Sequence, residues 1–397
     1  MMKNDLLSEA AAIDGELLRH RRYLHKNAGI GFELELAKQY VGAELSSLGY
    51  SPVSCGRCGL YADVGSSDRA ILLRADMDAL PIREKTGLGF AAKNGNMHAC
   101  GHDMHTAMLL GAAKILKAHE SELSRFVRLI FEPAEEILEG ACDMIGNGAL
   151  SGLDFEGAMM IHVASGVELR AGSVILPAAG IGAPSADHFS VEVIGRGAHG
   201  GTPQLSSDAI LTAAHLLSAF SELIARGVSI NERALLTVGR FDGGNSPNAI
   251  AGRAVLRGTL RTFDGEVRAR LKSRMVELSR GIATAFSCES DLIFEHGCPC
   301  LINSESAISR AKQCTEALRG ENFVFSADAL GAAAVGGSED FAYFCERIPS
   351  VALSLCAGEP SRGFSYPLHH EKTAFDESVL PVGAALYAGF ALEDSCL

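Results

Sequence analysis

A thiol and three imidazole side chains lie close together in one stretch of the sequence, Met97-His98-Ala99-Cys100-Gly101-His102-Asp103-Met104-His105. Thiolate sulfur and imidazole nitrogen are the usual protein ligands of zinc-like ions. Gly101 lets the backbone bend, so that Cys100 and His102 can face one centre. Loop histidines also occur in purely structural roles, but this density of ligand groups favours a metal site. The stretch therefore predicts metal binding by Cys100 and His102.

A second reactive stretch, Phe131-Glu132-Pro133-Ala134-Glu135-Glu136, ends an apolar run with proline and then presents adjacent carboxylates. Neighbouring side chains of an extended segment diverge, so one carboxylate can bind a metal while the other reaches a water molecule as general base. Paired glutamates taken alone more often belong to a solvated turn. Beside the cysteine and histidine stretch, they favour metal-assisted hydrolysis.

Three weaker signals stand at the ends of apolar runs or near them. His162 closes one run, Asp76 and Asp78 close another, and His369 precedes a C-terminal helical pattern. A lone histidine at a strand end is more often a packed core residue than a ligand. Because α/β sheets place their sites at the carboxyl ends of strands, we expect all five segments to converge there.

The elements that must position these residues read as an α/β layer. Two helices are expected between Leu6 and Leu48, and strands and helices then alternate, which predicts a mainly parallel sheet flanked by helices. The expected strands are 60–64, 70–75, 127–131, 158–161 and 351–355, and the further helices are 106–119, 307–318 and 379–392.

The order of elements changes from about Asp187 onward. A strand, a helix, two strands, a helix and a strand follow one another, which is the split βαβ arrangement of a ferredoxin-like α+β domain. Their ranges are 189–194, 208–226, 235–241, 253–262, 267–286 and 291–295. Such a unit folds compactly by itself, so we expect an inserted domain at 185–296 within a discontinuous domain made of 1–184 and 297–397.

Composition narrows the classes of function. The chain has 397 residues, more than one core usually organises, and 47% of them are hydrophobic, enough for two domains. A formal net charge of -13 repels phosphates and anionic lipid, so we expect a small-molecule substrate and neither nucleic acid nor a membrane as partner.

No signal-peptide pattern opens the sequence, and we see no uninterrupted apolar run long enough to cross a bilayer. Eleven scattered cysteines suit reduced thiols, so we expect a cytoplasmic protein. The isolated pair Cys55 and Cys58 leaves a redox or zinc role open beside the simpler interpretation as ordinary loop thiols.

Together these stretches resemble the aminoacylase/carboxypeptidase family of dinuclear metallohydrolases, in the amidohydrolase branch that contains hippurate hydrolases and plant auxin-conjugate hydrolases. The resemblance covers essentially the whole chain. Beside the Cys100/His102 stretch and the His369 segment, it is carried by Arg21-Arg22-Tyr23-Leu24-His25, Leu73-Arg74-Ala75-Asp76-Met77-Asp78-Ala79-Leu80-Pro81-Ile82, Pro133-Ala134-Glu135-Glu136 and Gly337-Ser338-Glu339-Asp340-Phe341.

The resemblance implies a site with two divalent metal ions, which are zinc, manganese, cobalt or nickel. Cys100 would bridge them, Glu135 would act as general base, and the remaining ligands would be His102, Glu136, His162 and His369. More distant members begin the site with a histidine where this chain has Asp76. Asp78 is then expected to orient a ligand rather than to bind metal.

The same resemblance implies that the inserted domain is a lid through which the protein forms a homodimer. His199 would reach the partner subunit's site and polarise the scissile carbonyl, which is a reasonable electrostatic role for an imidazole. Asn248 would help to hold the substrate. From the sequence alone, His199 could equally be a surface histidine of a glycine-rich turn.

The chain departs from the family's usual pattern at three places. Glu132 stands where glutamine is usual, Gly200-Gly201-Thr202 replaces bulkier residues, and His370-Glu371 replaces the common Ser-Pro after His369. These changes could reshape the pocket or alter its charge, which leaves the acyl-group preference open. Every expected ligand position still carries a competent side chain.

We therefore expect a metal-dependent hydrolase that cleaves the amide bond of N-acyl or N-aroyl amino acids by a two-metal-activated water, with Glu135 as the base. A dipeptidase or carboxypeptidase of the same family is the alternative, and a panel of substrates separates the two. A binding protein without activity would lack ligands. A cysteine hydrolase using Cys100 would survive chelation but not thiol alkylation.

Overall fold

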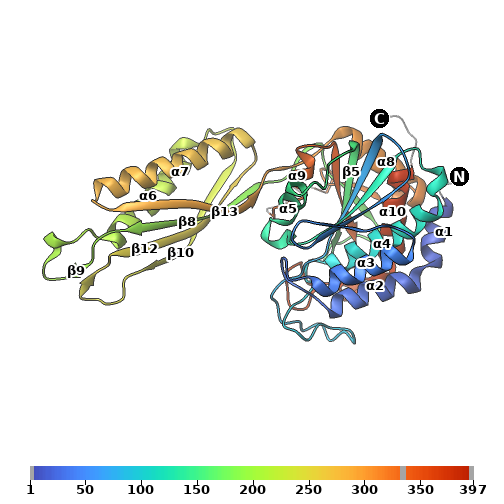
Figure 1. The fold of residues 1–397 in the computed structure, drawn as a ribbon, viewed down its shortest axis with the longest axis horizontal. Coiled ribbons are helices and arrows are strands. Elements are labelled where there is room, and N and C mark those ends of the chain that lie inside the picture. Colours follow the sequence, from blue (N-terminus) through green and yellow to red (C-terminus); the bar gives the residue numbers. More distant parts are fainter. Residues whose placement is uncertain (1–3, 331–336, 393–397) are drawn as a thin grey trace. The chain divides into compact units, whose positions relative to one another are not determined.

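The computed structural model describes residues 4–330 and 337–392, which fall into two compact units (Figure 1). As far as they are described, Met1–Gly182, Ile302–Ala334 and Glu339–Leu397 form unit 1, and Ala183–Leu301 with Val335–Ser338 forms unit 2. The insertion, predicted at 185–296, thus has limits of 183 and 301 in the structure.

Unit 1 is built on a mixed, mostly parallel eight-stranded sheet with the order β1-β2-β4-β3-β5-β16-β6-β15. The strands are β1 Val53–Cys55, β2 Gly59–Val64, β3 Arg69–Asp76, β4 Phe126–Glu132, β5 Asp154–Ala164, β6 Val174–Leu176, β15 Val324–Ser326 and β16 Ser350–Cys356. The central strands β4, β3, β5 and β16 are parallel to one another. β3 and β4 are buried along almost their whole length, as expected for parallel strands whose sheet is covered on both faces. This confirms the predicted α/β class.

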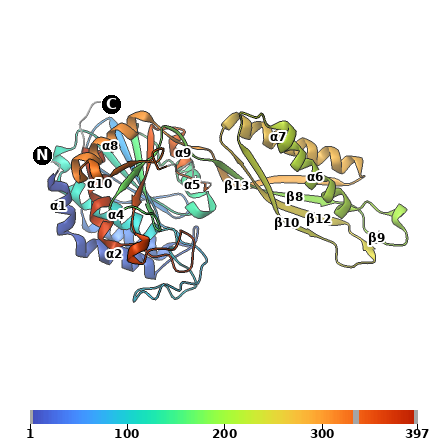
Figure 2. The same cartoon turned by 180° about the vertical axis from the view of Figure 1, so that it is seen from behind.

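Helices cover the sheet of unit 1, and Figure 2 shows them from behind. They are α1 Asn4–Ala12, α2 Asp14–Lys26, α3 Glu35–Ser47, α4 His102–Ala118, α5 Gly140–Gly146, α8 Glu305–Arg319, α9 Ala342–Cys345 and α10 Leu380–Leu392. The first two helices replace a single expected one, because the backbone leaves helical geometry at Ile13 (φ -104°, ψ 13°). α4 packs between α2 and α10 and is buried along most of its length.

Short 3-10 turns connect several of these elements. They are η1 Glu120–Glu122, η2 Glu135–Ile137, η3 Pro203–Leu205, η4 Glu321–Phe323, η5 Pro360–Arg362 and η6 Glu377–Val379. Two further strand pairs lie outside the main sheets. They join β9 Ala198–His199 to β11 Ala249–Ile250, and β7 Gly180–Ala183 to β14 Leu301–Asn303.

Unit 2 is an α+β domain with an antiparallel four-stranded sheet of order β10-β12-β8-β13. Its elements in chain order are β8 Ser185–Ile194, α6 Ala209–Gly227, β10 Ala234–Gly243, β12 Arg253–Thr262, α7 Gly265–Ala285 and β13 Glu289–Cys298. This is the predicted βαββαβ order. The two helices are N-capped by Asp208 and Asp264, whose carboxylates accept backbone N–H groups of the first turns.

The apolar helix α6 corrects one expectation from the sequence. Of the described helices it alone is long and apolar enough to cross a membrane by length and composition. Its buried positions Thr212, Leu216 and Phe220 recur at helical spacing and form part of the core of unit 2. Only 33% of the apolar window is buried in the structure, and Ile210, Leu211 and Leu217 on the same helix are exposed. One such helix is weak evidence for a membrane span.

Candidate metal centre

The predicted ligands of unit 1 are delivered by the carboxyl ends of parallel strands and by the start of α4. His162 lies near the end of β5, η2 follows β4, and His102 is the first residue of α4. Gly101 precedes that helix with φ 88°, and a Cβ there would lie 2.3 Å from Val163 Cγ2. The sharp entry of the chain into α4 therefore requires glycine.

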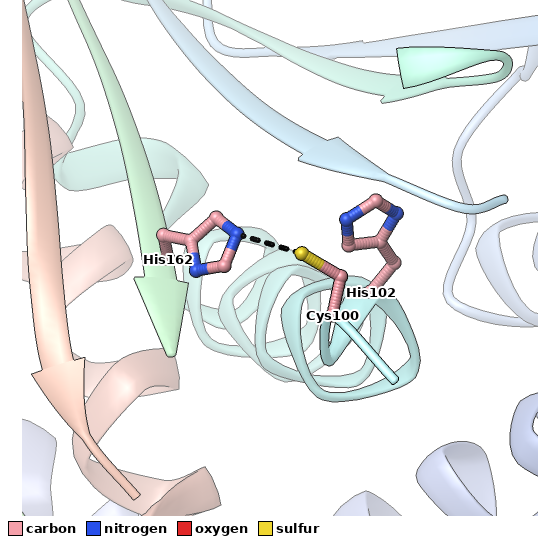
Figure 3. Close-up of side chains that lie close together, drawn as sticks. All are labelled: Cys100, His102 and His162. Carbon is pink, nitrogen blue, oxygen red and sulfur yellow. Dashed lines mark hydrogen bonds between the residues drawn. The ribbon is translucent and has the colours of Figure 1, made fainter. Parts of the chain in front are cut away.

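Cys100 lies at the middle of the ligand cluster, and Figure 3 shows its sulfur between the rings of His102 and His162. Its Sγ is 3.4 Å from His162 Nε2 and 3.3 Å from His369 Nε2. His369 Nε2 is also 3.6 Å from Glu136 Oε2. The structure thus brings together four side chains that come from distant parts of the sequence.

His102 completes the cluster from the other side. Its Nε2 lies 3.8 Å from both Glu135 Oε2 and Glu136 Oε1. Two of these buried atoms, His102 Nε2 and Glu136 Oε1, have no hydrogen-bond partner among the described residues. Buried polar atoms without a partner are costly, and a cation facing them would satisfy both.

Besides a group of His102, Glu135 and Glu136, two overlapping ligand groups can be drawn in this cluster, and Cys100 belongs to both. Cys100 with His102 and His162 forms one group, and Cys100 with Glu136 and His369 forms the other. Within each group the ligand atoms lie no more than 4.8 Å apart. Thiolate, imidazole and carboxylate together suit zinc-like divalent ions. The donor set therefore fits divalent metal ions, and the bridging role expected of Cys100 stays a prediction.

Asp78 lies behind the cluster and is fully buried. Its Oδ1 is 3.3 Å from His102 Nδ1 and accepts a 3.1 Å hydrogen bond from Glu135 N. Its Oδ2 accepts a 3.1 Å hydrogen bond from Glu136 N. One carboxylate thus holds both the imidazole and the backbone of the glutamate pair, which is how an outer carboxylate orients metal ligands.

The other two histidines of the stretch are not in the groups that contain Cys100, although His105 forms a further candidate group with Asp76 and His102. His105 Nδ1 is 2.6 Å from Asp76 Oδ1, and its Nε2 accepts a 2.9 Å hydrogen bond from Val163 N. Both ring nitrogens are therefore occupied, so His105 is a structural residue that links α4 to β3 and β5. His98 is buried, and no described ligand group includes it.

Burial sets the protonation of the ligands. It raises the pKa of the Cys100 thiol to about 12 and that of Glu136 to about 7. Burial, with His105 beside it, lowers the pKa of His162 to about 3. His162 is therefore neutral, the form that binds metal, whereas Cys100 must lose a proton when a cation binds.

Glu135 has the environment of a general base. It is 6% exposed, and burial, with the neighbouring carboxylates of Glu339 and Glu136, raises its pKa well above the usual range. A carboxylate whose pKa is raised in this way accepts a proton more readily at neutral pH.

A buried ion cluster around Arg74 lies beside the centre and was not predicted from the sequence. Arg74 is fully buried and donates to Glu132 through Nε (2.9 Å) and Nη2 (3.0 Å). The same guanidinium donates to Asp76 and Asp340. Glu132, expected as a change in the pocket, is fully buried against Arg74 instead of facing the ligands. The sequence signals were the strings that contain Arg74-Ala75-Asp76 and Glu339-Asp340, both among the stretches that carry the resemblance.

His199 and Asn248 lie together in unit 2. β9 pairs with β11, and Gly200 N donates a 2.8 Å hydrogen bond to the Asn248 carbonyl. His199 is exposed, and its Nδ1 accepts a hydrogen bond from Gly201 N. Their roles toward a substrate stay predictions. Cys55 and Cys58 are free, buried thiols of unit 1.

Comparison with known proteins places this chain among enzymes. A model of peptidase family M20/M25/M40 matches residues 72–393. The chain is 35% identical to the N-acetyl-L-cysteine deacetylase of Bacillus subtilis, covering 93% of this chain and 86% of that protein. It is 32% identical to the hippurate hydrolase of Campylobacter jejuni, covering 98% and 99%. The Bacillus subtilis YXEP protein, described as a dinuclear metal binding peptidase from the M20 family, superposes with a TM-score of 0.76 at 27% identity, covering 96% and 98%.

Proposed function

The chain belongs to peptidase family M20/M25/M40, and from this premise we propose that it cleaves the amide bond of N-acyl or N-aroyl amino acids. It is a metal-dependent hydrolase of that family. The products would be a carboxylic acid and a free amino acid. The names of the two similar enzymes, a deacetylase and a hippurate hydrolase, support an acyl substrate over a peptide.

The observation that carries the proposal is the placement of Glu135 beside the two overlapping ligand groups. Its carboxylate lies 3.8 Å from His102 Nε2, within reach of the space that the ligands surround. Hydrolysis by this arrangement needs a group that takes a proton from water and later gives it to the leaving nitrogen. Of the two glutamates in the cluster, Glu136 is a predicted metal ligand and Glu135 is not, so Glu135 is free to act as the base.

The residues divide the reaction among them. His102, Glu136, His162, His369 and Cys100 would hold two divalent ions, which would polarise the scissile carbonyl and lower the pKa of the attacking water. Glu135 would accept one proton from the water while the water oxygen attacks the carbonyl carbon. The carbon–nitrogen bond then breaks, and Glu135 returns the proton to the departing amine.

Unit 2 would supply substrate contacts. We assign His199, acting from a partner subunit, to donate a hydrogen bond to the carbonyl oxygen as negative charge develops there. Asn248, which directly precedes the strand β11 that pairs with β9, would bind the substrate. We also propose that the protein forms a homodimer and is cytoplasmic. The metal is proposed to be zinc, manganese, cobalt or nickel.

Replacement of Glu135 tests the proposal directly. We expect Glu135→Gln to lower kcat on N-acyl amino acids by roughly 10²–10⁴-fold, because the amide cannot accept the proton. Elemental analysis should still find two metal ions for each chain. Glu139→Gln is the matched control. Glu139 forms an ion pair with the exposed side chain of Arg57, so this variant should keep full activity. Normal turnover by Glu135→Gln would exclude this base.

A substrate panel decides the class of amide. N-acetyl, N-benzoyl and longer N-acyl amino acids are compared with dipeptides and C-terminally blocked peptides, using kcat/KM for each. We expect the acyl compounds to be preferred. Preference for dipeptides would assign the chain to the dipeptidase or carboxypeptidase alternative.

A further inference from the structure

The N-terminal string Arg21-Arg22-Tyr23-Leu24-His25 has no role in the site described above. It lies on α2, where Arg21 and His25 are one helical turn apart and therefore share a face. Each of the two is only 1% exposed. The apolar side chains Leu17 and Leu24 of the same helix belong to the core of unit 1. Packing of α2 therefore does not by itself explain two buried basic side chains.

Both basic side chains contact the same atom at the start of α4. Arg21 Nε donates a 2.9 Å hydrogen bond to Asp103 Oδ2, and His25 Nδ1 lies 2.8 Å from that oxygen. Asp103 is fully buried and directly follows the predicted ligand His102. Two contacts from α2 therefore hold the first turn of α4, which begins at His102.

The same two side chains also contact Glu84 and Glu377, which belong to two other segments of unit 1. His25 Nε2 lies 3.1 Å from Glu84 Oε2. Glu84 also accepts a hydrogen bond from Ala92 N, and this bond holds together the irregular segment from Glu84 to Ala92. Arg21 Nη1 lies 3.0 Å from Glu377 Oε1. Glu377 begins η6, shortly after the segment that carries His369.

The segment that carries His369 is tied to this network by Lys85. Lys85 N donates a 2.7 Å hydrogen bond to the Glu371 carbonyl, and Lys85 Nζ lies 2.8 Å from Glu371 Oε2. His369 itself has φ 64°, a left-handed conformation that is unfavourable for a residue other than glycine. Such a conformation persists only where surrounding contacts impose it.

We propose that Arg21 and His25 are positioning residues that clamp together the segment of Cys100 and His102 and the segment of His369. The inference rests on the proposed metal site. All three acidic partners of the clamp, Asp103, Glu84 and Glu377, lie on or beside the segments that bring in ligands. Holding those segments in place before metal arrives lowers the cost of ordering them, so the clamp strengthens metal binding without touching the ions.

Metal affinity, measured without substrate, tests the clamp. The zinc-loaded full chain is titrated with a fluorescent zinc chelator, and the zinc retained by wild type, Arg21→Met and His25→Gln is compared. Both variants should bind zinc roughly 10 to 100-fold more weakly, as is typical for the loss of an outer partner of a ligand. Wild-type affinity in both variants would overturn the proposal.

A matched control separates positioning from general destabilisation. Arg128→Met removes another buried guanidinium of unit 1, whose Nη2 lies 2.7 Å from Asp63 Oδ2 of β2. Arg128 lies near the start of β4, seven residues before Glu135. The variant should lower the Tm yet keep the zinc affinity of wild type. If Arg128→Met loses zinc as strongly as Arg21→Met does, the contacts of α2 are structural only and the clamp is wrong.

Two variants of exposed lysines, Lys85→Met and Lys93→Met, provide a second test in case Arg21→Met and His25→Gln fold poorly. Lys85→Met removes a 56% exposed side chain and its ion pair with Glu371, and should weaken zinc binding less than the buried variants do. Lys93→Met, at an exposed lysine of the same segment, should leave it unchanged. Equal zinc affinities in this pair contradict the link to His369. Failure of wild type to bind zinc would contradict the proposed function instead.

Discussion

The two units differ in where they place charge. Unit 1 fully buries Arg74, Asp76, Glu132 and Asp340 in one cluster beside the predicted ligands. In the part of unit 2 that the structure describes, Asp187 is the one buried carboxylate, and Arg268 and Lys272 pair with it from the surface. Burying charge opposes folding, so its concentration in one unit marks that unit as the one built around a reaction.

The sheets explain this difference. The central strands of unit 1 are parallel and covered on both faces, so their carboxyl ends meet at one edge where polar side chains can gather. In unit 2 the antiparallel edge strand β10 has partly exposed side chains along its whole length, with a core that is mostly aliphatic and aromatic. Its polar residues of interest lie apart from this sheet, His199 on the strand β9 and Asn248 directly before its partner β11.

The largest effect should come from removing the central cation of unit 1. Arg74→Met leaves several buried carboxylates without their partner and should lower the free energy of unfolding by about 3–5 kcal/mol. Arg253→Met, at a 67% exposed arginine of unit 2 that pairs with Glu192, should cost about 0–1 kcal/mol. Urea unfolding of both variants measures the two values. Similar losses would mean that the units do not differ in this respect.

A second comparison asks whether unit 2 contributes chemistry. His199→Ala should lower kcat by roughly 10²–10³-fold, the usual effect of losing one donor to a developing oxyanion. Because His199 lies outside the ligand cluster, the metal content should stay at the wild-type value. Unchanged kcat would reduce unit 2 to a structural role.

The third and smallest effect concerns pH and has opposite signs in the two units. Burial lowers the pKa of His25, but Asp103, with Glu84 adding and Arg21 opposing, raises it to about 9. The protonated form is therefore favoured by folding. Its contribution is complete below the unfolded pKa of about 6.5 and is lost as pH rises through 9. The nearby ring of His98 completes the surroundings of His25.

His188 of unit 2 behaves in the opposite way. Burial, with His296 stacked at 4.2 Å and Arg261 nearby, lowers the pKa of His188. Its contribution is present above pH 6.5 and is lost as the pH falls below that value. Unfolding free energies of His25→Gln and His188→Gln from pH 5 to 9, each subtracted from wild type, should show slopes of opposite sign. Parallel slopes would contradict the assignment.

Much of the fold could be predicted because its signals are local. The strand at 253–262 has the predicted limits, and the strand predicted at 70–75 spans Arg69–Asp76. Apolar runs and helical spacing are properties of neighbouring residues, so they are visible in the sequence. Short strands such as β6 and β15 were not predicted, because three residues carry little pattern and their pairing depends on a partner.

The ion cluster of unit 1 could not be predicted for a related reason. Arg74 meets Glu132 across 58 positions of sequence and Asp340 across 266. The apolar strand predicted at 70–75 places Arg74 among buried neighbours, but nothing local to it shows which carboxylates it meets. Its burial follows from the parallel register of β3 and β4, which sets Asp76 opposite Glu132.

The sequence by itself determined which side chains were available for metal chemistry, and the tertiary structure decided which of them face the centre. His102 and His105 are three residues apart on one helix and are chemically identical. Both ring nitrogens of His105 are engaged by Asp76 and Val163. His102 Nε2 instead faces Glu135 and Glu136 and has no hydrogen-bond partner among the described residues. An imidazole has two nitrogens, and its role follows from the groups that meet each of them. Only the packing of distant strands supplies those groups.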